Sequence, residues 1–539
     1  GRPSGRPGGP VLQHARPGRR GRDFWPAAPL PDPGRQPGRC DRMRGPGARP
    51  DPARSADEPD HRPAPGRRRG PGAEPDRVGR RSVPDARRRA GAVDPGRGAF
   101  ATLRFRGARG ATAAPPALTQ RSHTMTAHDP KFDTLPTDLY INGQFRPGTE
   151  GARFDVLNPA TEQVIASVAS AEIADADAAL DAAETAMADW AARTPRARSE
   201  VLRKAWELMT DRLEDFAHLI TLENGKARND AMGEAAYAAE FFRWFAEEAV
   251  RADGMITNAP ASGARIMVQR KPAGLAVLVT PWNYPAAMGT RKIAPALAAG
   301  CAVIIKPASE TPLTMLALMP LLEEAGVPPG LVNVLPSKRT GALVDHMLHD
   351  PRVRVVSFTG STGVGRKLLH AAADQVLKPA MELGGNAPLL VFEDADLDTA
   401  VEGAMLAKMR NLGEACTAAN RIYVHTDVAE AFTAKLTAAM SALKMGDGTD
   451  PSVDVGPLVN ADTRDKVAAF VADAVAKGAK VECGGAAPDG TGFYYPPTVL
   501  SNVPETADCV HDEIFGPVAA IQTFTDQEDV IRRANDTEY

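Results

Sequence analysis

Short apolar runs alternate with longer helical stretches between residues 274 and 358, and this alternation limits the fold more than any other feature of the chain. Residues 274–280, 301–305, 331–335 and 353–358 are almost continuously apolar, and helical patterns ending at residue 299 and spanning 312–325 separate them. Strands that are apolar on both faces and connected through helices indicate a parallel, doubly wound α/β sheet. Because such sheets bind ligands at the carboxyl ends of their strands, we expect a site in the loops after Thr280, Ile305 and Phe358.

The regions before and after this unit are also predicted to have regular structure. Residues 171–250 are rich in Ala and Glu and are predicted to be helical, with a helix over 211–222 and a loop at Glu223-Asn224-Gly225-Lys226. Residues 265–272 are predicted to form an extended arm rather than a core strand. A second alternating unit begins at residues 388–392 and carries Cys416. The sequence therefore predicts two α/β units and a short arm.

The first 124 residues differ in composition from the rest of the chain. They contain 27 Arg, 21 Pro and 19 Gly but no Lys, and their 11 acidic residues leave a net charge of about +16. Without hydrophobic periodicity, this segment is predicted to be disordered. A basic arm that binds nucleic acid and an organelle transit peptide are two interpretations. We favour a third, in which residues 1–124 are translated GC-rich sequence upstream of a start at Met125.

The cysteines and the apolar runs limit the class of protein further. The five cysteines, which form no C-x-x-C pair, are Cys40, Cys301, Cys416, Cys483 and Cys509. This pattern favours a reducing cytoplasm and argues against a disulfide framework or a zinc site, so no metal is expected. No apolar run approaches 18 residues, so no membrane span is expected.

Two short motifs offer a nucleophile and a base. Glu382 begins a glycine turn, Glu382-Leu383-Gly384-Gly385, and Cys416 lies 34 residues later among small and polar residues. A thiol attacks a carbonyl carbon as its thiolate, and hydrolysis of the covalent intermediate needs a water molecule with its own base. One Cys and one Glu in glycine-bounded loops meet both requirements.

Three further motifs follow predicted strands, and each has an ordinary structural alternative. Gly360 and Ser361 stand in a G-x-x-G-x-G turn that opens a helix, where backbone N–H groups can approach a pyrophosphate, although a plain β–α turn has the same form. Lys306 ends a strand, where its ammonium could bind a phosphate or could simply be solvated. The side chain of Asn283 could donate to an oxyanion or could simply cap a turn. Arg291 lies eight residues after Asn283, and Arg410 lies six residues before Cys416. Each alone is more often a surface charge, but two arginines flanking one reactive centre indicate an anionic substrate.

Taken together, the motifs resemble the aldehyde dehydrogenase superfamily, and most closely its succinate-semialdehyde dehydrogenase branch. The resemblance runs from about Leu139 to the end of the chain. The motifs that carry it occur in the family's order: Pro281-Trp282-Asn283-Tyr284-Pro285, Lys306-Pro307-Ala308-Ser309, Phe358-Thr359-Gly360-Ser361-Thr362, Glu382-Leu383-Gly384-Gly385-Asn386, Cys416-Thr417 and Glu513-Ile514-Phe515-Gly516-Pro517.

The resemblance implies a role for each motif. Cys416 would be the nucleophile, the side chain of Asn283 and the backbone N–H of Cys416 would form the oxyanion hole, and Glu382 would activate the hydrolytic water. The residues implied to bind the cofactor are Trp282, Lys306, Ser309, Gly360, Ser361, Leu383, Glu513 and Phe515. Relatives that prefer NAD commonly carry Glu three residues after the Lys, whereas this chain has the uncharged Ser309, so NADP is expected to be preferred and NAD accepted.

The substrate prediction depends on the two arginines. In the resembling branch, arginines at the positions of Arg291 and Arg410 hold the distal carboxylate of the substrate, which implies the oxidation of succinate semialdehyde to succinate. Glutarate semialdehyde, a broad range of aldehydes, a CoA-acylating reaction and an inactive fragment or binding protein on the same scaffold are the alternatives. Glu414 departs from the usual Gln, and we expect its side chain to point away from Cys416. Ala418 replaces the second cysteine of some relatives, so no redox switch is expected.

The resemblance also implies a domain organisation. Residues 125–255 and 273–383 would form a Rossmann-type cofactor domain, residues 256–272 an oligomerisation arm, and residues 384–539 the catalytic domain. We expect a cytoplasmic homodimer or homotetramer that binds no nucleic acid and no membrane. Relatives continue for several tens of residues after the position of Tyr539, so the chain is expected to be a fragment whose catalytic domain is incomplete.

Overall fold

The computed structural model describes residues 135–539, so the interpretations of residues 1–124 lie outside the described part of the chain. Within it, the larger sheet has seven strands in the order β11-β10-β7-β8-β9-β1-β2. These strands are β1 (Leu139–Ile141), β2 (Gln144–Arg146), β7 (Leu275–Val279), β8 (Val303–Lys306), β9 (Val332–Val334), β10 (Val353–Thr359) and β11 (Lys378–Glu382). Strands β7 to β11 are parallel, which confirms the predicted doubly wound sheet.

Helices cover both faces of this sheet. The helices α5 and α6 contact the layer formed by α2, α3 and α4, whereas α7 contacts both α1 and α8. The bounds of these helices are α1 (Ile173–Ala192), α2 (Pro195–Asp211), α3 (Leu213–Asn224), α4 (Arg228–Ala249), α5 (Ala287–Ala299), α6 (Leu313–Ala325), α7 (Thr340–His349) and α8 (Thr362–Asp374). Helices α5 and α6 end where predicted because Gly300 and Gly326 adopt the left-handed conformation that terminates a helix.

One local prediction needs correction, and one local element was not predicted. The helix predicted over 211–222 is α3, which begins at Leu213 and continues to Asn224, so the loop begins only at Gly225, whose φ is 93°. The antiparallel edge formed by β1 and β2 was not predicted. It is a two-residue hairpin at Asn142-Gly143, whose φ values of 54° and 76° suit an Asn-Gly turn.

The smaller sheet has five strands in the order β12-β13-β16-β15-β14. Its strands are β12 (Ala387–Val391), β13 (Ala419–His425), β14 (Lys480–Cys483), β15 (Thr498–Ser501) and β16 (Val518–Phe524), and all neighbours except β14 and β15 are parallel. The helices of this unit are α9 (Leu397–Met409), the 3₁₀ helix η1 (Arg410–Gly413), α10 (Thr426–Ser441), α11 (Ala461–Ala476), α12 (Asp508–His511) and α13 (Gln527–Asn535). The chain thus passes from the larger to the smaller sheet between β11 and β12.

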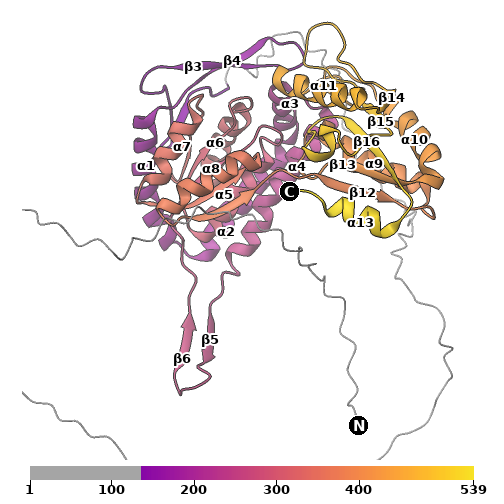
Figure 1. Ribbon diagram of the computed structural model, residues 1–539. Helices are drawn as coiled ribbons and strands as arrows, with labels where there is room; N and C mark the ends of the chain where they lie inside the picture. The colour runs from indigo at the N-terminus through magenta and orange to yellow at the C-terminus, as the bar shows by residue number, and fades with distance from the viewer. Residues whose placement is uncertain (1–134) are drawn as a thin grey trace, which may run out of the picture. The chain divides into compact units, whose positions relative to one another are not determined.

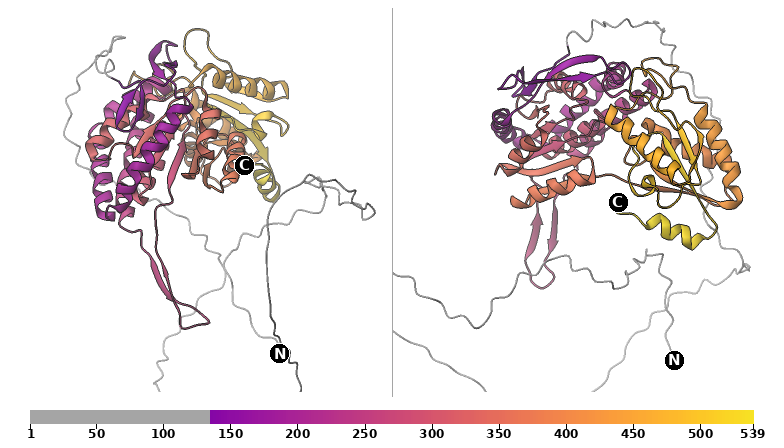
Figure 2. Two further views of the ribbon diagram at one scale, coloured as in Figure 1. Left: turned by 90° about the vertical axis from the view of Figure 1, so that its left-hand side faces the viewer. Right: turned by 45° about the horizontal axis from the view of Figure 1, so that its top comes forward.

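Two hairpins complete the described fold. Strands β3 (Arg153–Leu157) and β4 (Val164–Ala169) form one, and β5 (Met255–Asn258) and β6 (Arg265–Val268) form the other. The β5–β6 hairpin projects away from the helices and sheets in every view (Figures 1 and 2), and all eight of its strand residues are exposed. The prediction of an extended arm at 265–272 is therefore confirmed, with residues 255–258 as its second strand. Among the described residues, no helix is long and apolar enough to cross a membrane.

Candidate active site

The predicted motifs meet at one edge of the larger sheet because its parallel strands end in register. Val279 at the end of β7 pairs with Lys306 at the end of β8, and Thr359 at the end of β10 pairs with Glu382 at the end of β11. The Asn283 turn follows β7 directly. Strand ends that are far apart in the sequence therefore lie together at one edge of the sheet, and this edge carries Asn283, Lys306 and Glu382.

A strained loop brings Cys416 from the smaller unit to this edge. Asn411, Leu412 and Gly413 all have positive φ, at 53°, 56° and 74°, although only glycine adopts this region at no cost. A Cβ on Gly413 would lie 2.4 Å from the carbonyl oxygen of Gly516, so the close packing requires glycine there. The three left-handed residues turn the chain out of α9 and into the loop that presents Cys416.

Cys416 lies against the glycine turn of Glu382. A Cβ on Gly385 would be only 2.6 Å from the carbonyl oxygen of Cys416, so this contact is possible only for glycine. On the other side, the side-chain Nδ2 of Asn283 donates to the carbonyl oxygen of Glu414, two residues before Cys416, at 2.8 Å. The structure therefore brings together the loops of the three predicted catalytic residues, which are Cys416, Glu382 and Asn283.

Burial and the charges around Cys416 together determine the ionisation of its thiol. Of the four cysteines in the described residues, Cys416 is the exposed one. Partial desolvation of its sulfur nevertheless raises the pKa of the thiol, the negative charges of Glu513 and Glu382 raise it further, and the positive charge of Arg291 opposes the rise. Carboxylates near the sulfur disfavour the thiolate, so the resting thiol is mostly protonated at neutral pH.

Glu414 does not contribute a charge to the thiol. Its side chain is fully buried and accepts a hydrogen bond from the backbone N–H of Val459 at 3.3 Å. Burial raises the pKa of this carboxyl to about 8, with the Val459 N–H and the charge of Lys226 opposing the rise. Glu414 is therefore mostly neutral at pH 7, and its carboxyl faces Val459, in agreement with the expectation that it points away from Cys416.

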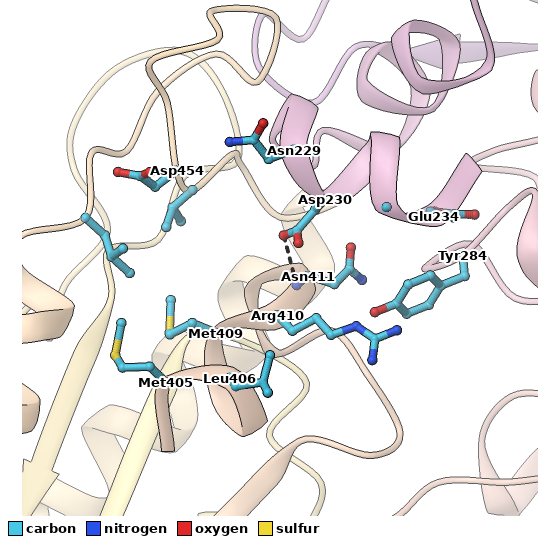
Figure 3. Close-up of a pocket in the computed structure, with 13 residues that line it drawn as sticks. Asn229, Asp230, Glu234, Tyr284, Met405, Leu406, Met409, Arg410, Asn411 and Asp454 are labelled. Carbon is cyan, nitrogen blue, oxygen red and sulfur yellow. Dashed lines mark hydrogen bonds between the residues drawn. The ribbon is translucent and has the colours of Figure 1, made fainter. Parts of the chain in front are cut away.

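The two predicted substrate arginines lie on different elements beside the site. Arg291, on α5, places its guanidinium 5.5 Å from the ring centroid of Phe241. Arg410, at the start of η1, lies 5.9 Å from the ring of Tyr284 and lines a cavity of about 510 Å³, whose other lining residues include Asp230, Met405 and Met409. Figure 3 shows the Arg410 guanidinium directed toward the Tyr284 ring, with the methionines on the opposite side of the cavity. Arg291 is not one of the lining residues.

Lys292, which no sequence motif marks, lies near the predicted base Glu382. Its Nζ donates to the hydroxyl of Ser357 at 2.9 Å, and the side chain is largely buried. Desolvation lowers the pKa of this ammonium to about 8, and the charge of Glu382 opposes the shift. Lys292 follows Arg291 directly in the sequence, but on α5 the two side chains point to different groups: Lys292 to Ser357 and Arg291 to the ring of Phe241.

The residues at the strand ends fit a phosphate-bearing cofactor. The Lys306 ammonium is buried at the end of β8, and desolvation lowers its pKa to about 8. At the β10–α8 turn, Ser361 caps α8 by accepting from the N–H of Val364 at 3.4 Å. The buried hydroxyls of Thr359 and Thr362 find no hydrogen-bond partner among the described residues, and an anionic group at this helix N-terminus would accept from them.

Of the remaining predicted cofactor residues, Glu513 lies near the thiol, because its charge raises the pKa of Cys416. Glu513 accepts a hydrogen bond from the N–H of Gly385 at 3.3 Å, and the rings of Trp282 and Phe515 are in an edge-to-face contact at 5.3 Å. Leu383 packs against α8, where a Cβ on Gly365 would lie 2.4 Å from its side chain. The hydroxyl of Ser309 donates to Glu310 at 3.4 Å, so a carboxylate lies next to the position that was expected to be uncharged.

The chain belongs to the aldehyde dehydrogenase family, because the model of that family matches residues 145–539. It is similar to a succinate-semialdehyde dehydrogenase of Paenarthrobacter nicotinovorans, with 54% identity over 376 residues that cover 70% of this chain and 84% of the relative. A glutarate-semialdehyde dehydrogenase of Pseudomonas putida is 45% identical over 400 residues, or 74% of this chain and 83% of that protein. The crystal structure of an Escherichia coli NADP-dependent enzyme has a TM-score of 0.74 and 45% identity, covering 76% and 85% of the two chains.

These matches confirm the family expected from the motifs and the fold that it implied. The protein is accordingly an aldehyde dehydrogenase.

Proposed function

We propose that this protein oxidises succinate semialdehyde to succinate with NADP as the preferred cofactor. The observation that carries the proposal is the presence of two arginines around the site: the charge of Arg291 acts on the Cys416 thiol, and the Arg410 guanidinium lies 5.9 Å from the ring of Tyr284 in the Asn283 turn. A substrate with a distal carboxylate would pair with these cations, whereas a neutral aldehyde would gain no such charged interaction. The relatives named for succinate and glutarate semialdehydes support the same substrate class.

The proposed chemistry begins when the Cys416 thiol releases its proton to solvent and the thiolate, the minor form at neutral pH, adds to the aldehyde carbon. The second N–H of the Asn283 amide and the backbone N–H of Cys416 stabilise the oxyanion that forms, because they are fixed donors directed at developing charge. A bound nicotinamide supplies the acceptor for the hydride that leaves the carbon, and Cys416 then carries a thioester. Glu382 removes a proton from a water molecule that attacks the thioester, and the acid is released as the thiolate departs.

The first test of this proposal compares succinate semialdehyde with butanal, which has the same chain length and no distal carboxylate. Arg410→Met should lower kcat/KM for succinate semialdehyde about 10- to 100-fold, the worth of a charged hydrogen bond, and should leave kcat/KM for butanal within a factor of about three. Arg196→Met, at an exposed arginine of α2, is the matched control and should change neither substrate. Equal losses for both aldehydes in Arg410→Met would refute the carboxylate clamp. Comparing kcat/KM for glutarate semialdehyde, as a third substrate, with that for succinate semialdehyde shows which chain length of substrate the enzyme prefers.

Cofactor preference gives a second test, with dissociation constants measured by fluorescence titration. Ser309→Glu should weaken NADP binding at least about tenfold, because a carboxylate would face the 2′-phosphate, and should favour NAD. Glu310→Gln should instead strengthen NADP binding, since it removes the carboxylate beside Lys306. In the wild type, NADP binding should weaken as pH rises through about 8, where the Lys306 ammonium loses its charge, while NAD binding changes less. Unchanged NADP affinity in Ser309→Glu would contradict the assignment.

We also propose that the β5–β6 hairpin joins copies of this chain. Its strands expose five apolar side chains, namely Met255, Ile256, Ile266, Met267 and Val268, and a projecting two-stranded hairpin has little stability without a partner surface. Sedimentation of a variant with charged residues at Ile256 and Met267 should show smaller particles than the wild type; an unchanged sedimentation coefficient would exclude this arm as the interface.

A further inference from the structure

The loop between α3 and α4, singled out in the sequence but given no role so far, contains a buried cation. Lys226 has a completely buried side chain, and its Nζ donates to Oε2 of Glu234 at 2.6 Å and to the backbone carbonyl oxygen of Asn283 at 2.7 Å. The same Nζ lies 4.2 Å from the ring centroid of Tyr284. A buried lysine is costly unless it is paired and hydrogen-bonded, and here every contact is directed at Glu234 or at the Asn283 turn.

Glu234 extends this contact to the helix that follows the turn. Its Oε1 accepts from the backbone N–H groups of Ala286 and Ala287 at 2.8 and 3.2 Å, at the beginning of α5. These N–H groups have no partner within the helix, and a carboxylate at a helix N-terminus is favourable. The Lys226–Glu234 pair therefore holds the Asn283 turn at its carbonyl and at the helix that begins after it.

The carbonyl of Asn283 also connects the turn to the loop of Cys416. Nδ2 of Asn411 donates to this carbonyl at 3.2 Å and to the carbonyl of Glu414 at 3.0 Å. The side-chain Nδ2 of Asn283 donates to the same Glu414 carbonyl. In contrast, Oδ1 of Asn283 is buried and has no partner among the described residues. The direction of the remaining N–H of the amide therefore depends on the position of the Asn283 backbone and on the one hydrogen bond from Nδ2 to the Glu414 carbonyl.

We propose that Lys226, through its ion pair with Glu234, is a positioning residue that holds the Asn283 amide toward the oxyanion formed at Cys416. This inference rests on the proposed function, since it takes Asn283 as the oxyanion donor. Lys226 contacts neither Cys416 nor the residues expected to bind the cofactor, apart from the turn itself. An oxyanion donor must lie within a few tenths of an ångström of its position, so loss of one buried anchor affects the rate more than substrate binding.

The test is a double-mutant cycle between the pair and Asn283, with the first-turnover rate of NADPH formation and KM for succinate semialdehyde as readouts. The pair is changed together, as Lys226→Met with Glu234→Gln, so that no unpaired charge is left buried and Gln retains an acceptor for the helix N–H groups. Asn283→Ala should lower the first-turnover rate about 10²-fold or more. The pair variant should lower it about 10- to 100-fold with KM changed less than about threefold, and in the Asn283→Ala background its further effect should be below about threefold.

Arg198→Met is the matched control for buried charge. Arg198 is a buried cation that donates to the carbonyl of Ala298 at the other end of α5, at 3.1 Å. Its variant should lower the thermal midpoint but leave the first-turnover rate within about threefold. If the pair variant does not fold, Lys226→Arg, which keeps the charge but moves its donors, enters the same cycle.

The outcomes separate this inference from the function on which it rests. If Asn283→Ala retains the wild-type rate, the oxyanion assignment fails and the inference fails with it. If Asn283→Ala is slow but the pair variant is fast, or if the two losses multiply fully, Asn283 keeps its role and Lys226 is only a structural residue. The positioning role is supported if the pair variant slows the first turnover in the wild type but adds little in the Asn283→Ala background, while Arg198→Met keeps its first-turnover rate.

Discussion

Cys416→Ser is expected to reduce NADPH formation by a factor on the order of 10⁴ or more. The hydroxyl has the same reach but is far less acidic and less nucleophilic than the thiol, and loss of a nucleophile removes the covalent route altogether. The measurement is the increase in NADPH absorbance with succinate semialdehyde at saturating cofactor. Binding of NADP, followed by fluorescence, should remain unchanged and shows that the variant is folded.

Cys483→Ser is the control for this prediction. Cys483 is a partly buried thiol in β14, whose Sγ lies 3.7 Å from the carbonyl oxygen of Pro497, and it has no contact with the site. Its variant should retain at least about half of the wild-type rate, because an exchange away from special features has a small effect. A Cys416→Ser enzyme with the rate of the Cys483→Ser enzyme would refute a covalent mechanism through Cys416.

The sequence was sufficient to place Asn283, Lys306 and Glu382 because each lies at the end of a strand or shortly after it. Lys306 and Glu382 are at the ends of parallel strands, and the carboxyl ends of such strands meet whatever the loops between them do. The helix ends at Ala299 and Ala325 could be predicted for a similar reason, since each is followed by a glycine. The positions of these residues and helix ends depend on short stretches of sequence, so they can be predicted from the sequence.

Long-range contacts at the site could not be predicted in this way. The carbonyl of Asn283 meets Lys226 from 57 residues earlier and Asn411 from 128 residues later. No spacing rule connects these three positions, because the contacts depend on how the two sheets pack. The left-handed conformation of Asn411 and Leu412 was also missed, since neither residue marks a turn as clearly as glycine does.

Glu414 illustrates how burial changes the meaning of a residue. From the sequence, a carboxylate two residues before the nucleophile threatens the thiolate through its charge. In the structure it is buried against Val459 with a pKa of about 8, so at pH 7 it acts mostly as a neutral group. The sequence shows the residue type, but only the packing shows its protonation state.

Glu382→Gln is expected to change two measured rates in opposite directions. Steady-state turnover should fall about 10²- to 10³-fold, because no carboxylate remains to take the proton from the hydrolytic water. A burst of NADPH close to one equivalent per active site should precede this slow phase, since formation of the thioester does not use Glu382. Quenched-flow measurement with succinate semialdehyde separates the two phases.

The second rate is the alkylation of Cys416 by iodoacetamide in the absence of cofactor. The charge of Glu382 is one cause of the raised pKa of the thiol, so its removal should lower that pKa and increase the thiolate fraction. Alkylation at pH 7.5 should therefore be faster in Glu382→Gln than in the wild type, and the pH profile should move to lower pH. Glu402→Gln, at an exposed position of α9, is the control and should alter neither rate.

Opposite changes in the two rates distinguish a base from a structural residue. A variant that merely disturbs the loop would slow the burst as well as turnover, because the glycine turn after Glu382 packs against Cys416. Slow turnover without a burst would place the defect before the thioester and would rule out Glu382 as the hydrolytic base. A burst of full amplitude with faster alkylation follows only if Glu382 lies near the sulfur as a charge and acts after acylation as a base.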